Sequence, residues 1–237
     1  MSAAILVIGN EVLSGGVKES NANFFISELF KLGIRVKKVE IIPDVMEEII
    51  DRVQVLSKNY DYLFVTGGIG ATHDDLTREA VAKAVNQDFV MNKEAEEILM
   101  SFYKDRILLN HLEAARLPKN CEIIVNHRKP VCYGFKVNNV FVYPGFPELL
   151  LDLFPATIPY LKKGTLYKTE VKTDLYESEY ADALTAIANR YPDLEIGSYP
   201  KLQPHPFKTL ITVSGDNEKK VNECLQTIIK ELKVTPL

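Results

Sequence analysis

Two short runs of apolar residues, each stopped by glycine, most constrain the fold of this chain. Residues 3–8 (AAILVI) end at Gly9, and residues 62–65 (YLFV) end at a Thr-Gly-Gly sequence, residues 66–68. A strand that is apolar on both faces belongs in the middle of a parallel sheet covered by helices on both sides. The first part of the chain is therefore predicted to be an α/β domain.

The residues between and after these runs alternate between helix and strand patterns. Apolar residues at helical spacing over 25–32 stop before Gly33, residues 35–42 are β-branched, and residues 49–56 mark a second helix. A further helix is expected at about 76–85. The order β-α-β-α-β-α predicts a three-layer, doubly wound, mostly parallel sheet with right-handed crossovers.

The next stretch extends this domain. Residues 92–118 carry a helical pattern, residues 121–125 favour a strand, and residues 133–137 face residues 140–143 across an Asn-Asn turn typical of a hairpin. A proline-bounded helix then runs to residue 161 and is followed by a Lys-Lys-Gly sequence. This punctuation predicts a domain boundary.

With that boundary, residues 1–164 form the α/β domain and residues 165–237 a small second module. The module has the pattern β-α-β-β-α, with elements expected at residues 168–175, 177–191, 194–198, 207–213 and 221–232. A unit of this size and order predicts a two-layer α+β module.

Composition limits the partners of the chain. Its 237 residues hold 28 Lys and Arg against 32 Asp and Glu, a net charge of -4, which predicts no nucleic-acid partner and no anionic membrane surface. The chain lacks both a run of roughly 20 apolar residues and a basic leader, so a cytoplasmic protein without a membrane partner is expected. Cys121, Cys132 and Cys224 lack the spacing of a zinc site or a disulfide framework.

Three loops follow the carboxyl ends of the first three predicted strands, where open α/β sheets bind ligands. They are residues 9–16 (GNEVLSGG), Pro43-Asp44 and residues 66–75 (TGGIGATHDD). Six of the twelve glycines lie in the first and third loops. Glycine at this density permits positive φ and a close approach of the backbone to a ligand.

The third loop is the most informative. Gly67, Gly68 and Gly70 can turn backbone N–H groups toward a phosphate or diphosphate, Thr66 and Thr72 can add hydroxyls, and the next helix points its positive end at the same place. Neither a P-loop nor a GxGxxG spacing is present. An acidic chain needs such a backbone site, or a metal ion, to hold phosphate.

Several acidic residues flank these loops. Asp74 and Asp75 cannot both point the same way, so one can cap the helix while the other is a metal ligand or base; simple capping by both is an equal alternative. Asp44 is either a helix N-cap or a functional acid at the same sheet edge. Glu11 can hold a hydroxyl or metal, or be a solvated loop acid.

Two further features stand near the predicted sheet edge. Asn21 most simply begins the first helix. Pro144-Gly145, within the sequence PGFPE, is either punctuation after a strand or a wall of the site.

Together these loops resemble the MoaB/Mog molybdopterin-binding fold family, and more narrowly the N-terminal domain of CinA proteins and the molybdopterin-binding-like domain of eukaryotic FAD synthase. The resemblance is carried by residues 8–21, 66–77 (TGGIGATHDDLT), 144–148 (PGFPE) and 196–200 (IGSYP). The sequence also departs from the family: Ala71 replaces a usual proline, Asn10 a common aspartate, and residues 128–135 lack the usual GxAPGF arrangement.

The resemblance implies a hydrolase of a nucleoside diphosphate linkage, ADP-ribose or FAD, that depends on a divalent metal such as Mg²⁺, Mn²⁺, Co²⁺ or Ni²⁺. Asp44 and Asp75 match catalytic aspartates of the family and are the implied metal ligands. The implied nucleotide- or phosphate-binding residues are Gly9, Asn10, Glu11, Asn21, Thr66, Gly67, Gly68, Gly70, Thr72, Asp74, Pro144 and Gly145.

Two alternatives stay open. One is a molybdopterin-binding adenylyltransferase, and the other is a catalytically silent nucleotide-binding protein, which the Ala71 and 128–135 departures favour. In each case the expected partner is a small nucleotide or pterin. Relatives form dimers and trimers, so a homo-oligomer is also expected.

Overall fold

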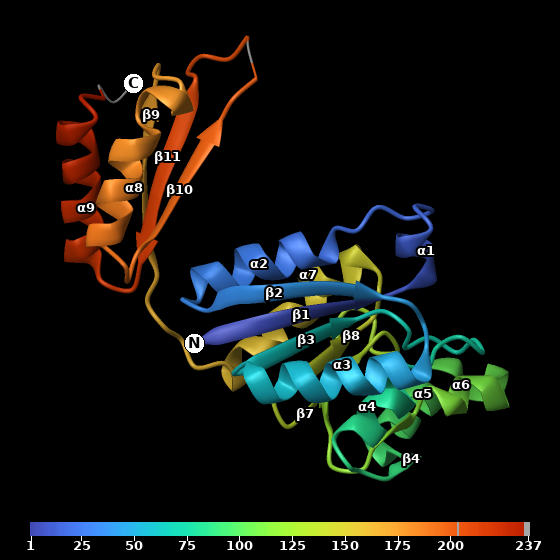
Figure 1. Ribbon diagram of the computed structural model, residues 1–237. Helices are drawn as coiled ribbons and strands as arrows, with labels where there is room; N and C mark the ends of the chain where they lie inside the picture. The colour runs from blue at the N-terminus through green and yellow to red at the C-terminus, as the bar shows by residue number, and fades with distance from the viewer. Residues whose placement is uncertain (203, 235–237) are drawn as a thin grey trace. The chain divides into compact units, whose positions relative to one another are not determined.

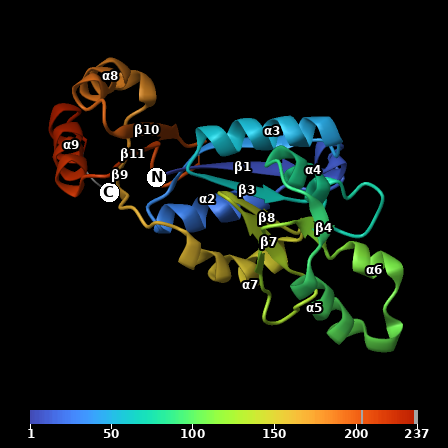
Figure 2. The same ribbon diagram turned by 90° about the horizontal axis from the view of Figure 1, so that it is seen from below.

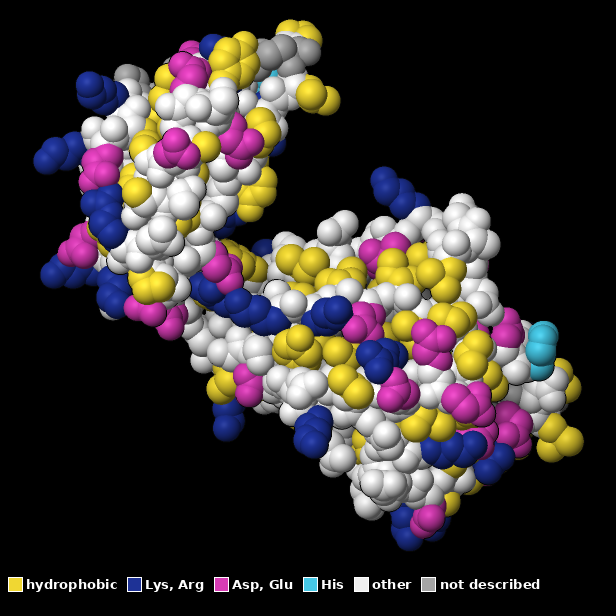
Figure 3. Space-filling view, in the orientation of Figure 1, with side chains coloured by type: hydrophobic (Ala, Val, Ile, Leu, Met, Phe, Trp, Pro, Cys, Tyr) yellow, Lys and Arg dark blue, Asp and Glu magenta, His cyan; other side chains and the backbone are white. Residues whose placement is uncertain are grey.

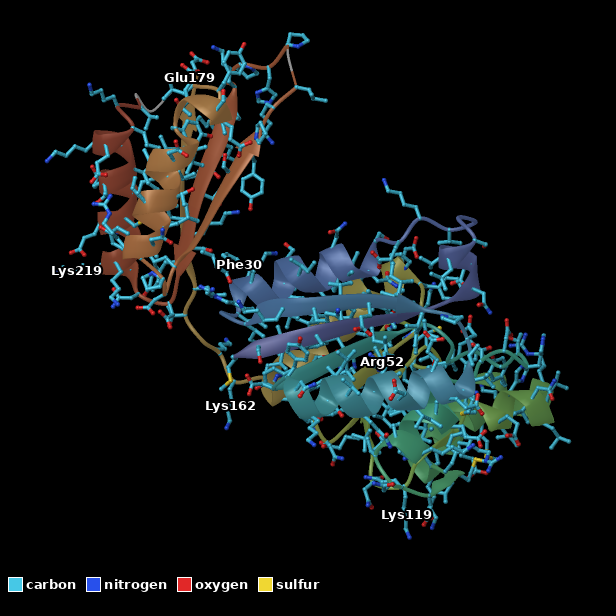
Figure 4. All side chains as sticks on the ribbon, in the orientation of Figure 1. Phe30, Arg52, Lys119, Lys162, Glu179 and Lys219 are labelled. Atoms are coloured by element: carbon cyan, nitrogen blue, oxygen red, sulfur yellow. The ribbon has the colours of Figure 1, made fainter. Side chains whose placement is uncertain are left out.

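The computed structural model describes residues 1–202 and 204–234 of the chain (Figure 1). The chain divides into two compact units. The N-terminal unit comprises Met1–Phe30 with Ile34–Lys162, and the C-terminal unit comprises Lys31–Gly33 with Lys163–Leu237. Lys162, the last residue of the N-terminal unit, is labelled in Figure 4.

A six-stranded sheet in the order β2-β1-β3-β8-β7-β6 forms the centre of the N-terminal unit. Its strands are β1 (Ser2–Ile8), β2 (Arg35–Ile42), β3 (Tyr62–Thr66), β6 (Glu122–Ile124), β7 (Gly134–Val137) and β8 (Val140–Tyr143). The first four neighbours in this order run parallel, and β7 is antiparallel to both β8 and β6. The predicted mostly parallel α/β sheet is confirmed.

Helices cover both faces of this sheet. Figures 1 and 2 show α2 (Asn21–Lys31) and α7 (Pro147–Thr157) on one face, and α3 (Met46–Asn59) with α4 (Thr77–Ala84) on the other. On the α3 side, alternate residues of β1 and β3 join one apolar core with α3 and α4. The opposite side holds an aromatic cluster in which the Phe64 ring lies 5.2 Å from the rings of Phe25 and Phe141. Burial on both faces explains why β1 and β3 are continuously apolar.

One part of the predicted helix at 92–118 is wrong. The helices present are α5 (Lys93–Tyr103) and α6 (Leu109–Glu113), and Arg116–Pro118 is instead a strand, β5. It pairs antiparallel with β4 (Phe89–Met91), which the sequence did not suggest. Three residues are too short for a recognisable alternating pattern, so only the pairing with a segment far away in sequence makes them a strand.

The expected loop at residues 9–16 also contains more structure than predicted. A short helix, α1 (Asn10–Leu13), begins immediately after Gly9.

The C-terminal unit has the predicted order β-α-β-β-α. Its elements are β9 (Tyr167–Thr173), α8 (Ala181–Arg190), β10 (Glu195–Pro200), β11 (Thr209–Gly215) and α9 (Glu218–Glu231). The three strands form an antiparallel sheet in the order β10-β11-β9, and its core contains Val171, Ile187, Ile211 and Ile228. None of the described helices in the chain is long and apolar enough to cross a bilayer.

Candidate functional site

Four parallel strands, β2, β1, β3 and β8, end at the same edge of the sheet, so the loops that follow them meet there. Backbone bonds join these ends. The Gly9 N–H donates to the Ile42 carbonyl over 3.1 Å, and the Gly67 N–H donates to the Tyr143 carbonyl over 3.1 Å. The chain order places β2 and β3 on opposite sides of β1, the arrangement that opens a ligand crevice in this class of fold.

Gly67 fixes how closely the loop after β3 approaches the end of β1. Its φ is +102°, and a Cβ on it would lie 2.0 Å from the Ile8 carbonyl oxygen. A side chain cannot be accommodated at this point, because the obstacle is backbone rather than a flexible side chain.

Asn21 does more than begin α2. Its side-chain amide donates to Thr66 Oγ1 over 2.9 Å and to the Gly145 carbonyl over 2.8 Å. Thr66 Oγ1 in turn donates to the Pro144 carbonyl over 3.1 Å. The structure thus brings together four predicted site residues from three separate segments.

Asp75 closes the glycine-rich loop. Its two carboxylate oxygens accept hydrogen bonds from the Gly70 N–H, at 2.6 Å, and from the Thr72 N–H, at 2.8 Å. The Thr72 hydroxyl lies 2.5 Å from Asp75 and 2.6 Å from Asp74, and its hydrogen bond holds the pKa of Asp74 below its usual value. The Gly70 N–H and the Thr72 hydroxyl, both expected to face a phosphate, therefore face Asp75 in this structure.

Neither aspartate of this pair caps α4. The N-cap of that helix is Leu76, which makes no side-chain cap bond. Likewise Asp44 does not cap α3, whose N-cap is Val45. The capping alternatives considered for these three acids do not describe what the residues do.

Asp44 connects the first loop to the third. One of its oxygens accepts a bond from the Asn10 N–H over 2.8 Å. Its other oxygen lies 3.3 Å from the position that a Cβ on Gly68 would take. Asp75 is therefore bonded to the glycine-rich loop, and Asp44, which is bonded to the first loop, lies close to Gly68.

Buried polar atoms without a hydrogen-bond partner are concentrated at this edge. Among the described residues these atoms are Asn21 Oδ1, Thr77 Oγ1, Arg78 Nε and Asn126 Nδ2. Asn21 begins α2, Thr77 and Arg78 begin α4, and Asn126 follows β6, which runs in the same direction as β8. Since buried polar atoms are nearly always paired, such a concentration indicates a place where a ligand or ordered water completes the bonding.

A hollow of about 340 Å³, including its open mouth, lies at the same edge. Its wall includes the predicted residues Glu11, Asn21, Thr66, Gly67 and Gly145. Asp44, Asp74, Asp75, Gly68, Gly70 and Thr72 do not line it, and Gly9 and Asn10 lie beside it in sequence without lining it.

Lys18 and Glu19 also line this hollow, although neither was predicted as a site residue from the sequence. Glu19 accepts a bond from the Ala22 N–H over 2.7 Å and so caps the start of α2. A glutamate that precedes the helix is not the N3 glutamate of a capping box, so the sequence carries no recognised capping signal here. The pocket position of Lys18 has no sequence signal either, because it depends on how the 14–20 segment folds.

Arg78 is a second omission. Only 7% of this residue is exposed, and its guanidinium donates to the Ile69 carbonyl over 3.1 Å. Arginine in the first turn of a predicted helix reads as a solvated residue, so only the structure reveals its burial.

The carboxylates of Asp44 and Asp75 could hold a divalent cation only if a phosphate ligand supplied further oxygen ligands. The described residues contain no group of three or more His, Cys, Asp or Glu side chains that could hold a metal. Both oxygens of Asp75 already accept loop bonds, and Asp44 has one oxygen bonded to Asn10. Mg²⁺ is commonly held by one or two carboxylates plus substrate phosphates, and this donor set suits that mode rather than an all-protein cage.

Comparisons with known proteins agree with this geometry. Residues 4–163 match the family model described as "Probable molybdopterin binding domain", and residues 165–236 match "FAD synthase, middle domain". An Archaeoglobus fulgidus protein is 34% identical over 226 residues, 95% of this chain and 96% of its own length.

Two further similarities are informative. A "Probable FAD synthase" of Caenorhabditis briggsae is 30% identical over 98% of this chain, which spans only 50% of that relative. The crystal structure of CinA, a protein "with unknown function" from Thermoplasma acidophilum, has a TM-score of 0.63 and 28% identity. That similarity covers 67% of this chain and 96% of the CinA chain.

Proposed function

The chain belongs to the MoaB/Mog-like family of molybdopterin-binding domains, joined to an FAD synthase middle domain, and we propose that it hydrolyses a nucleoside diphosphate linkage with a divalent metal. ADP-ribose and FAD are the proposed substrates. The similarity to an FAD synthase supports a nucleotide ligand. The expectation from the CinA-like loop motifs supports a hydrolytic rather than a synthetic reaction.

One observation carries this proposal. At the shared strand edge, Asp44 and Asp75 are held near the glycine-rich loop by backbone N–H bonds, and neither caps the helix that follows it in sequence. Two carboxylates placed near one glycine-rich loop suit a phosphate ligand that brings a cation with it. The hollow at the same sheet edge, lined by Asn21, Thr66 and Gly145, is the proposed contact surface for the rest of the nucleotide.

Each group has a defined part in the reaction. Asp44 and Asp75 would hold the cation, which when bound offsets the diphosphate charge and lowers the pKa of a coordinated water. Water adds to one phosphorus, and the bridging P–O bond breaks with its electrons going to the leaving phosphate. ADP-ribose would give AMP and ribose 5-phosphate, and FAD would give AMP and FMN.

The test is AMP release from ADP-ribose and from FAD with Mg²⁺, Mn²⁺, Co²⁺ or Ni²⁺. Asp75→Ala and Asp44→Asn are each expected to lower the rate by about a hundredfold, the upper end of the range for substitutions that disturb a metal site. Asp88→Ala is the matched control, because Asp88 is an exposed acid that pairs with Lys119 away from the loops. The proposal is wrong if no metal supports release, or if Asp75→Ala releases AMP at the parent rate.

A second candidate is a molybdopterin-binding adenylyltransferase, which the description of the matched family favours. It requires ATP-dependent adenylylation of the pterin, a product that mass spectrometry distinguishes from AMP release.

A third candidate is a catalytically silent nucleotide-binding protein. It is favoured by the occupation of the Gly70 and Thr72 N–H groups by Asp75. Calorimetry that shows ADP-ribose binding without turnover would support it. The homo-oligomer stays a prediction, for which light scattering is the measurement.

A further inference from the structure

Arg78 is a buried cation that no ion pair explains. Of its side-chain groups, one terminal nitrogen donates to the Ile69 carbonyl, whereas the buried Nε has no partner among the described residues. Burial lowers the pKa of the guanidinium from its usual value. A buried charge without a close counter-charge costs free energy, so a negative group that approaches it is strongly favoured.

The place of Arg78 connects this charge to the glycine-rich loop. Ile69 lies between Gly68 and Gly70, so the guanidinium holds the middle of the loop. The carboxylates of Asp75 and Glu113 act on Arg78 only as longer-range charges, without an ion-pair contact in the described part of the chain. The oxygens of Asp75 are instead bonded to Gly70 and Thr72.

The surroundings make an internal cation useful. The chain carries a net charge of -4, and Figure 3 shows several acidic side chains on the end of the N-terminal unit where the loops lie. An anion that approaches this end meets an unfavourable surface field. A fixed positive charge next to the loop offsets that field at short range.

We propose that Arg78 is a positioning residue for a diphosphate: it holds the glycine-rich loop through Ile69 and supplies a buried positive charge that the bound anion compensates. This inference rests on the ligand class of the proposed function and not on hydrolysis. Because the charge is already buried and oriented, it needs no rearrangement when the ligand binds.

The experiment measures the affinity of the full chain for ADP-ribose and for inorganic pyrophosphate by calorimetry, without metal and with Mg²⁺. Arg78→Met keeps the apolar stem and removes the charge, whereas Arg78→Lys keeps the charge. Arg116→Met is the control for loss of a compensated arginine, since Arg116 also donates to a backbone carbonyl, that of Phe89, but is paired with Glu113.

Loss of a charge-assisted contact predicts about tenfold weaker binding for Arg78→Met. Arg78→Lys is expected to recover most of that loss, and Arg116→Met to bind as the parent does. Removal of an uncompensated buried charge offsets the loss of the bond to the Ile69 carbonyl, so the melting temperature of Arg78→Met stays close to that of the parent. A merely structural arginine would give a clearly lower melting temperature and no recovery of binding by lysine.

The outcomes separate this inference from the proposed function. A parent protein that binds ADP-ribose and never hydrolyses it contradicts the proposed function alone. Arg78→Met binding as tightly as the parent, or equal loss in Arg78→Met and Arg78→Lys, overturns the role of Arg78. A parent that binds neither anion, with or without Mg²⁺, overturns both.

Discussion

The carbonyl oxygen of Ile8 occupies the space into which a side chain on Gly67 would project, with 2.0 Å between that oxygen and the Cβ position. This approach packs the loop after β3 against the end of β1. Gly67 and Ile8 both line the hollow, so this close approach fixes part of its wall. A side chain at residue 67 is therefore expected to disturb the site.

Gly67→Ala is expected to destabilise the N-terminal unit by about 2 kcal/mol or more, because the positive φ and the backbone clash are both unfavourable. Gly145→Ala is the control, since its added Cβ would lie 3.5 Å from Gly67 Cα, an ordinary contact. Urea unfolding measures both. Equal stability of the two variants would contradict the close approach at Gly67.

Asn21→Ala is expected to lower the free energy of unfolding by about 2 kcal/mol, because it removes two hydrogen bonds and leaves the Gly145 carbonyl without its donor. It should also weaken ADP-ribose binding, since Asn21 lines the hollow. Asn92→Ala provides the comparison: it removes the cap of α5 at a cost of about 1 kcal/mol, and we expect no change in binding. Urea unfolding and calorimetry are measured on both variants. Equal loss of ADP-ribose affinity in Asn21→Ala and Asn92→Ala would show that the loss comes from lower stability and not from the contact that Asn21 makes.

Cys121 and Cys224 are expected to resist alkylation in the folded protein at pH 8. Burial raises the pKa of each thiol to about 11, so the reactive thiolate is scarce at that pH. Iodoacetamide labelling followed by peptide mapping measures the rates, with the urea-unfolded chain as reference. Labelling of either residue at the unfolded rate would contradict this burial.

Acid stability should depend on the Glu122–Lys136 pair, which joins opposite residues of β6 and β7 over 2.8 Å. The hydrogen bond from Lys136 lowers the pKa of Glu122. A lowered carboxyl pKa adds stability above the unfolded value of about 4.3, and that stability is lost as the pH falls through the folded value. Between about pH 5 and pH 3, the free energy of unfolding of Lys136→Met should therefore fall less than that of the parent. Urea unfolding of both proteins at each pH measures the difference. The effect is small, because Glu122 is half exposed and solvent screens the pair.

The apolar runs were sufficient to predict the sheet. Because β1 and β3 are apolar on both faces, both faces must be covered by helices, as in a parallel sheet. Parallel strands then bring the glycine loops that follow them to one edge of the sheet. The short pair β4 and β5 could not be predicted in the same way. Its three-residue strands are defined by pairing between residues 89–91 and 116–118, which no local pattern encodes.

The site shows the same division. Sequence spacing identified Asn21, Thr66 and Gly145, which the structure connects, but not the direction in which each side chain points. The bonds of Asp75 to its own loop and the burial of Arg78 depend on backbone turns and on neighbours from other elements. Pattern reasoning treats such residues one at a time and therefore misses both.

The bond from Asn21 to the Gly145 carbonyl spans 124 residues of sequence. Closing so long a loop carries a large entropic cost, and contacts of this separation slow folding. During synthesis from the N-terminus, β1, β2 and β3 leave the ribosome well before β8, so a nascent chain ending before residue 140 has its glycine loops but not the strand that anchors α2. Ligand-binding competence would therefore arise late in translation, as a property of the nearly complete N-terminal unit.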